Sequence, residues 1–104
     1  MAAGVSKVNA MARTLDALGH PLRIRIVALL ACKEMYLNEV ANNLGVSRAL
    51  AKVHLKKLEK AGLVKSRVEL VEGEAKALRY YKLQDFSVQV SPQTIRKEVE
   101  NNGC

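Results

Sequence analysis

The sequence predicts a mainly helical domain that carries one β-hairpin. Over residues 5–61, apolar side chains recur every three or four positions, as they do on one face of an α-helix. Over residues 63–83, the period shortens to two, which is typical of strands. With one more helical stretch after the hairpin, the expected order is four helices, two strands and a last helix. The 104 residues are enough for a single domain.

Two helices are expected before residue 33. The first spans residues 5–18, where the apolar positions are Val8, Met11, Ala12, Leu15 and Leu18. Gly19 is a suitable stop, and Pro21 suits the first turn of a second helix because its missing N–H would be unpaired there. Leu22, Ile26, Leu29 and Leu30 form the apolar stripe of that second helix. Cys32 falls within the pattern and is expected to be a small buried side chain.

The next two helices are joined by a short turn. A brief apolar stripe runs from Leu37 to Leu44, and Gly45 follows where a tight turn needs a positive φ. Ser47 is a good N-cap for a fourth helix that ends near residue 61, just before Gly62. Its inner stripe consists of Ala51, Leu55 and Leu58, with His54 at the edge.

A hairpin and a last helix complete the chain. Residues 63–71 are expected to pair with residues 76–83 around a turn that contains Gly73. Ser91 and Pro92 then start a helix over residues 91–101, which has few apolar positions and must pack on the body or on a partner chain.

Three helices followed by a hairpin form the pattern of a winged helix-turn-helix, here as one domain over residues 1–104. The helix-turn-helix itself spans residues 37–61, and the hairpin at 63–83 is the wing. In this motif, the second helix can lie in the major groove of DNA with its first residues against base edges. The fourth helix is therefore the candidate recognition helix.

The outer face of that helix mixes basic and small apolar residues. A face that only keeps a protein soluble rarely has this mixture, whereas a groove-reading face can place apolar groups against thymine methyls and arginine against guanine. Lysines further along can reach phosphates. The residues expected to contact DNA are Ser47, Arg48, Ala49, Lys52, Val53, Lys56, Lys57 and Lys60 on the helix, and Arg67, Lys76 and Arg79 on the wing.

The net charge of +7 favours a polyanionic partner. We expect double-stranded DNA and a sequence-specific transcription regulator, most simply a repressor. A non-specific, architectural DNA binder and a winged-helix protein-interaction module remain alternatives. An enzyme is not expected, because the chain offers no nucleophile–base pair and no Gly-rich phosphate loop.

The sequence lacks the signals of a membrane protein, of a secreted protein and of a metal site. No apolar run is long enough to span a bilayer, and the first residues lack the apolar core of a signal peptide, so a cytoplasmic protein without a membrane partner is expected. No cofactor or metal is expected. His20 and His54 lie far apart in the sequence, and neither has a partner at ligand spacing.

Two stretches resemble the arsenic-repressor (ArsR) family of dimeric transcription regulators. "LDALGHPLRIRIVALL" is similar to the family's opening segment, and "LNEVANNLGVSRALAKVHLKKLEKAGLV" resembles its helix-turn-helix block. Many members sense metals through a CVC motif, but the corresponding positions here are Tyr36 and Asn38, which have no thiolate. The Asp, His and Glu site that other members carry on the last helix is also missing, with only Cys104 as a soft ligand. The inducing signal therefore stays open.

The resemblance also implies a homodimer joined by the first and last helices. The sequence is compatible with this, because the first helix is apolar over a broad face and the last helix needs a surface to rest on. The side chains expected at the interface are Val8, Met11, Leu15, Ile95 and Val99. A two-fold dimer would present two recognition helices to successive major grooves.

Overall fold

The fold is a helical body with a three-stranded sheet, described by a computed structural model over residues 3–74 and 76–99. The elements are α1 (Ala3–Leu18), α2 (Pro21–Cys32), β1 (Met35–Tyr36), α3 (Leu37–Leu44), α4 (Arg48–Lys60), β2 (Val64–Leu70), β3 (Ala77–Leu83) and α5 (Pro92–Val99). The mainly helical, winged helix-turn-helix prediction is confirmed, and the order differs from the expected one only by the short strand β1.

The helix boundaries follow the residues that predicted them. Pro21 is the first residue of α2, and the residue before it acts as the N-cap: His20 Nδ1 accepts a hydrogen bond from the backbone N–H of Leu22 at 3.0 Å. The turn between α3 and α4 depends on Gly45, whose φ of 69° lies in the left-handed region that favours glycine. Ser47 then caps α4 by accepting a hydrogen bond from the N–H of Leu50 at 3.0 Å.

The sheet has the strand order β1-β3-β2, with both pairs antiparallel. The hairpin pairs Val64 with Leu83 and Leu70 with Ala77, within the expected ranges. Strand β1 adds only two residues, of which Met35 lies opposite Tyr81. This strand was not predicted, since two residues are too few to show an alternating pattern.

An aliphatic core joins the helices to the base of the sheet. The fully buried side chains include the inner stripe of α4, as expected, together with Ile26, Val40, Val64 and Tyr81. Two expectations for α2 were incomplete or wrong. Arg23 is buried with the apolar residues, at 8% exposure, whereas Cys32 is exposed and not a buried small side chain. The last turn of α2 rotates Cys32 out to solvent, where its thiol lies 3.7 Å from the carbonyl oxygen of Ala28.

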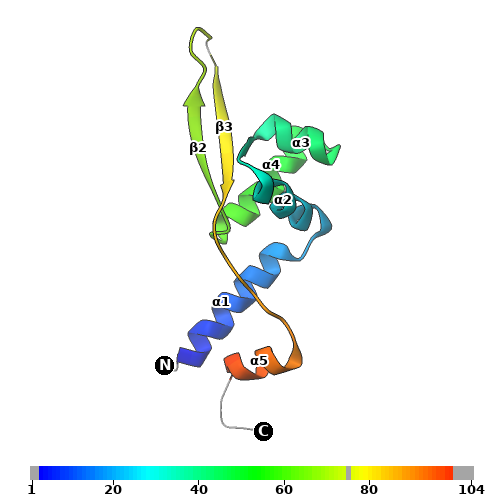
Figure 1. The fold of residues 1–104 in the computed structure, drawn as a ribbon, viewed down its shortest axis with the longest axis vertical. Helices are drawn as coiled ribbons and strands as arrows, with labels where there is room; N and C mark the ends of the chain where they lie inside the picture. Colours follow the sequence, from blue (N-terminus) through cyan, green and yellow to red (C-terminus); the bar gives the residue numbers. More distant parts are fainter. Residues whose placement is uncertain (1–2, 75, 100–104) are drawn as a thin grey trace.

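The molecule is elongated, with extents of 62 × 26 × 21 Å. The wing projects from one end of the helical body, and α5 lies beside the N-terminal part of α1 at the other end (Figure 1). Helix α5 buries none of its described residues. Within residues 3–74 and 76–99, no helix combines the length and the hydrophobicity that a membrane span requires.

Candidate nucleic-acid interface

Helix α4 has two chemically distinct faces. Ala51, Leu55 and Leu58 are fully buried on the inner face. All the residues of α4 that were expected to contact DNA are exposed on the other side: Arg48, Ala49, Lys52, Val53, Lys56, Lys57 and Lys60. The structure thus brings the predicted helix residues together on one solvent-facing surface, which we call the α4 outer face, with the capping Ser47 at its start.

A buried arginine supports α4 from behind. The Nε–H of Arg23 donates a 2.6 Å hydrogen bond to the carbonyl oxygen of Ala17 in α1. Its Nη1 lies 3.0 Å from His54 Nδ1 in α4. A guanidinium can only donate, so His54 accepts at Nδ1 and carries its proton on Nε2. Arg23 therefore connects the end of α1 to the middle of α4.

The surroundings of His54 favour its neutral form. Burial lowers the pKa of His54 below its usual value, and the electrostatic effects of His20, Arg23 and Lys57 lower that pKa further. Protonation at Nδ1 would also replace an acceptor by a donor that faces the Arg23 guanidinium. His54 is thus a buried residue, at 7% exposure, whose Nδ1 faces Arg23.

The two histidines are neighbours in space. The ring centroids of His20 and His54 lie 4.3 Å apart, although the two residues are 34 positions apart in the sequence. Sequence spacing gave no sign of this contact, because it depends on how α2 packs against α4. Both Nδ1 atoms already have partners, namely Leu22 N–H and Arg23. In the described ranges, no group of three or more His, Cys, Asp or Glu side chains could hold a metal ion.

The three wing residues expected to contact DNA differ in how many contacts their side chains make within the protein. Arg79 is exposed, and its guanidinium donates to Ser66 Oγ at 3.0 Å. Lys76, near the tip, is paired with Glu74 at 3.5 Å, and both side chains are more than half exposed. Exposed pairs of this kind are weak and can exchange for a phosphate.

Arg67 is more strongly engaged within the protein. It forms a bidentate pair with Glu34, with distances of 3.0 and 3.2 Å, and a further ion pair with Glu69. Its guanidinium also lies over the Tyr80 ring, 4.8 Å from the centroid. These hydrogen bonds lower the pKa of Glu34 and raise that of Arg67. Most of the donors of Arg67 are therefore occupied, and this residue ties the wing to the segment before β1.

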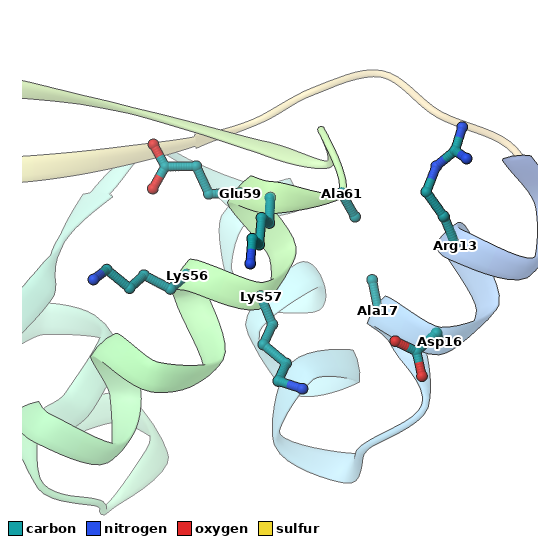
Figure 2. A pocket seen from close by; sticks show the side chains of 8 residues that line it. Arg13, Asp16, Ala17, Lys56, Lys57, Glu59 and Ala61 are labelled. Atoms are coloured by element: carbon teal, nitrogen blue, oxygen red, sulfur yellow. The ribbon is translucent and has the colours of Figure 1, made fainter.

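A groove separates the C-terminal end of α4 from α1. Four basic residues and two acidic residues line it: Arg13, Lys56, Lys57, Lys60, Asp16 and Glu59. Ala17 and Ala61 lie between them, and the labelled charged side chains diverge and do not converge on a common centre (Figure 2). The groove has basic walls but no assembled ligand site.

The side chains expected at a dimer interface lie on α1 and α5. Val8, Met11 and Leu15 are half-buried on α1. Ile95 and Val99 are exposed on α5, by 41% and 60%. The structure thus leaves apolar surface open on α5, at the end of the molecule far from the wing (Figure 1). The remaining soft ligand considered in the sequence, Cys104, falls outside the described residues.

Comparisons with known proteins agree with this architecture. Residues 20–66 match the family of bacterial regulatory proteins named arsR. The chain is also 36% identical, over 86 residues, to an uncharacterized HTH-type transcriptional regulator from Methanocaldococcus jannaschii. The matched residues make up 83% of this chain and 88% of that protein. The chain belongs to the ArsR family.

Solved structures with the same fold include other ArsR-family and repressor proteins. One is the homodimeric winged helix-turn-helix DNA-binding domain of a possible ArsR-family regulator from Mycobacterium bovis (TM-score 0.68, 26% identity, 80% of this chain and 71% of that chain). Another is the transcriptional repressor BigR from Xylella fastidiosa, with a TM-score of 0.65 and 24% identity, and the match covers 77% of this chain and 76% of that chain. The second likeness is one of fold alone. As an ArsR-family chain, this protein lacks thiols at Tyr36 and Asn38, where CVC-type members carry them.

Proposed function

We propose that this ArsR-family protein is a DNA-binding transcriptional regulator that recognises specific double-stranded sites with α4. The observation that carries the proposal is the α4 outer face. Four lysines and Arg48 are exposed there beside small apolar residues, while the opposite side of the helix is fixed in the core. Family membership supports the same function. The chemistry expected of this surface is base recognition near Ser47 and phosphate contact near Lys60.

The proposed assembly is a homodimer formed through α1 and α5. The exposed Ile95 and Val99 support it, as does the homodimeric Mycobacterium bovis domain. A two-fold dimer would place its two α4 helices in major grooves one helical turn apart. Occupation of such a site near a promoter would block transcription, so repression is the simplest proposed outcome. The regulator would act in the cytoplasm, where DNA is accessible.

The proposal is tested by selecting duplexes from a random pool and measuring affinity for the selected site and for random duplex at physiological salt. A specific regulator is expected to prefer its site by at least about 10³. R48A should reduce this ratio, because Arg48 lies at the start of α4. K60A should weaken both duplexes alike and reduce the salt dependence of binding. Equal affinity of the wild type for all duplexes would instead indicate an architectural DNA binder. If the protein binds no duplex even at low salt, it is a protein-interaction module.

A further inference from the structure

We propose that α4 reads thymine methyl groups and guanine acceptors only, and that Leu50 and Val53 are the methyl-contacting side chains. This inference rests on the proposed function, because it names the base chemistry that the same helix recognises. It also adds Leu50, which the apolar and basic pattern of the sequence did not single out.

The first observation is an apolar cluster at the exposed start of α4. Val53 is 53% exposed and Leu50 is 41% exposed, and Ala49 beside them is exposed as well. Residues three and four positions apart are neighbours on a helix surface, so the three side chains form one patch. Valine is a weaker helix former than alanine or lysine. Helix propensity therefore does not account for Val53, and solubility accounts for neither Val53 nor Leu50, whereas contact with apolar groups in the major groove accounts for both.

The second observation is that the α4 outer face has almost no hydrogen-bond acceptor. Its polar side chains are arginine and lysine, which only donate. The two nearby acceptors each already have one partner within the protein: Ser47 Oγ accepts from the N–H of Leu50, and Glu59 accepts from Ser66 Oγ at 2.7 Å. His54 is buried against Arg23.

The donors and acceptors on α4 determine which bases its side chains can recognise. Adenine N6 and cytosine N4 are donors and need an acceptor such as an Asn, Gln or Glu side chain. Between Arg48 and Leu58, α4 contains none of these residue types. Guanine presents two acceptors to Arg48 or Lys52, and thymine presents its methyl group to the apolar patch. Guanine and thymine are thus the two bases that the side chains of this helix can recognise positively.

The spacing of the patch suits adjacent base pairs. Leu50 and Val53 are three residues apart, which corresponds to a rise of about 4.5 Å along the helix. Successive base pairs are separated by about 3.4 Å. The two side chains can therefore contact methyl groups on neighbouring base pairs, so each half-site should contain two thymines at adjacent positions.

The experiment uses the site selected from a random duplex pool and the same duplex with deoxyuridine in place of every thymidine in its half-sites. Deoxyuridine keeps the base pairing and removes only the methyl group. Each lost methyl contact should weaken binding about fourfold, so the loss of four contacts over both half-sites should weaken binding by the wild type on the order of 10²-fold. In the variant L50A/V53A, the preference for the thymidine duplex should fall to no more than about fourfold per half-site, the contribution of the one contact that Ala49 can still make.

Matched controls separate this effect from a general loss of binding. V90A makes the same change at a residue with similar exposure (55%) outside α4, and it should keep the full preference for thymidine. V53A alone is expected to fold, because alanine is the better helix former at an exposed position. If the wild type still prefers its selected site over random duplex but binds the deoxyuridine duplex equally well, methyl recognition is wrong while the proposed function stands. If no duplex is preferred over random sequence, both are overturned.

Discussion

Arg23 links α2 to both α1 and α4 through buried hydrogen bonds. Its guanidinium is buried, yet it donates to a carbonyl oxygen of α1 and to His54 of α4. A buried charge is tolerated only when its hydrogen bonds are made. Arg23 therefore fixes the position of α4 relative to α1, and its removal should affect the stability of the whole helical body.

Replacing Arg23 by alanine should lower the free energy of unfolding by roughly 2–4 kcal/mol, because it leaves a void and an unpaired His54 Nδ1. Urea unfolding followed by circular dichroism measures this change. The matched control is R25A, which removes an exposed arginine from the same helix and should change stability by less than about 0.5 kcal/mol. Equal effects of the two variants would show that the buried contact has no special role.

Acid should destabilise the protein through His54. Its pKa is lowered in the folded state by burial and by the electrostatic effects of His20, Arg23 and Lys57. As the pH falls below the unfolded-state pKa of about 6.5, the unfolded chain binds a proton that the folded chain does not, so the free energy of unfolding decreases. The contribution of His54 is fully present above that pH, and it is lost as the pH falls through the lowered pKa.

The pH dependence is measured by urea unfolding across the acidic range for the wild type and for H54Q. The glutamine cannot titrate but can still accept a hydrogen bond from Arg23. H54Q should therefore show a smaller decrease in stability on acidification. An unchanged pH profile would assign the acid sensitivity to other groups.

These residue-scale contacts could not be predicted from the sequence. Arg23 and His54 are 31 positions apart, and a helical pattern gives no reason to bury an arginine among leucines and isoleucines. The exposure of Cys32 depended in the same way on where α2 ends. Such contacts follow from the packing of helices against each other, and not from the period of a single helix.

At the scale of elements, the start of α4 depends on its cap. Ser47 satisfies a backbone N–H that would otherwise have no intrahelical partner. S47A should lower the free energy of unfolding by about 1 kcal/mol, whereas S47D, which can also cap, should stay close to the wild type. Urea unfolding of both variants checks this, and equal stability of S47A and the wild type would contradict the capping role.

Most elements could be predicted because the relevant signals are local. The period of apolar residues placed the helices, Gly45 placed the turn, and the phase of α4 separated its buried stripe from its outer face. Strand β1 could not be predicted, because it exists only through its pairing with β3. The ion pair between Arg67 and Glu34 could not be predicted from the sequence either, because the two residues are 33 positions apart.

At the scale of the whole molecule, the open apolar surface of α5 predicts assembly. I95E/V99E should convert the proposed dimer to a monomer, because two charges would be placed in an apolar interface. Sedimentation at several protein concentrations measures the change. V68E introduces a charge at an exposed valine of the wing and should leave the dimer intact. A wild type that sediments as a monomer at all concentrations would exclude dimerisation through α5.

The central claim is that α4 lies in the major groove and reads bases there. Dimethyl sulfate protection tests it most directly, because this reagent methylates guanine N7 in the major groove and adenine N3 in the minor groove. On the selected site, we expect protected guanine N7 positions in two clusters about 10 base pairs apart, and loss of that protection with R48A. Full reactivity of guanine N7 on a site that the protein still occupies would contradict the assignment of α4 as the recognition helix.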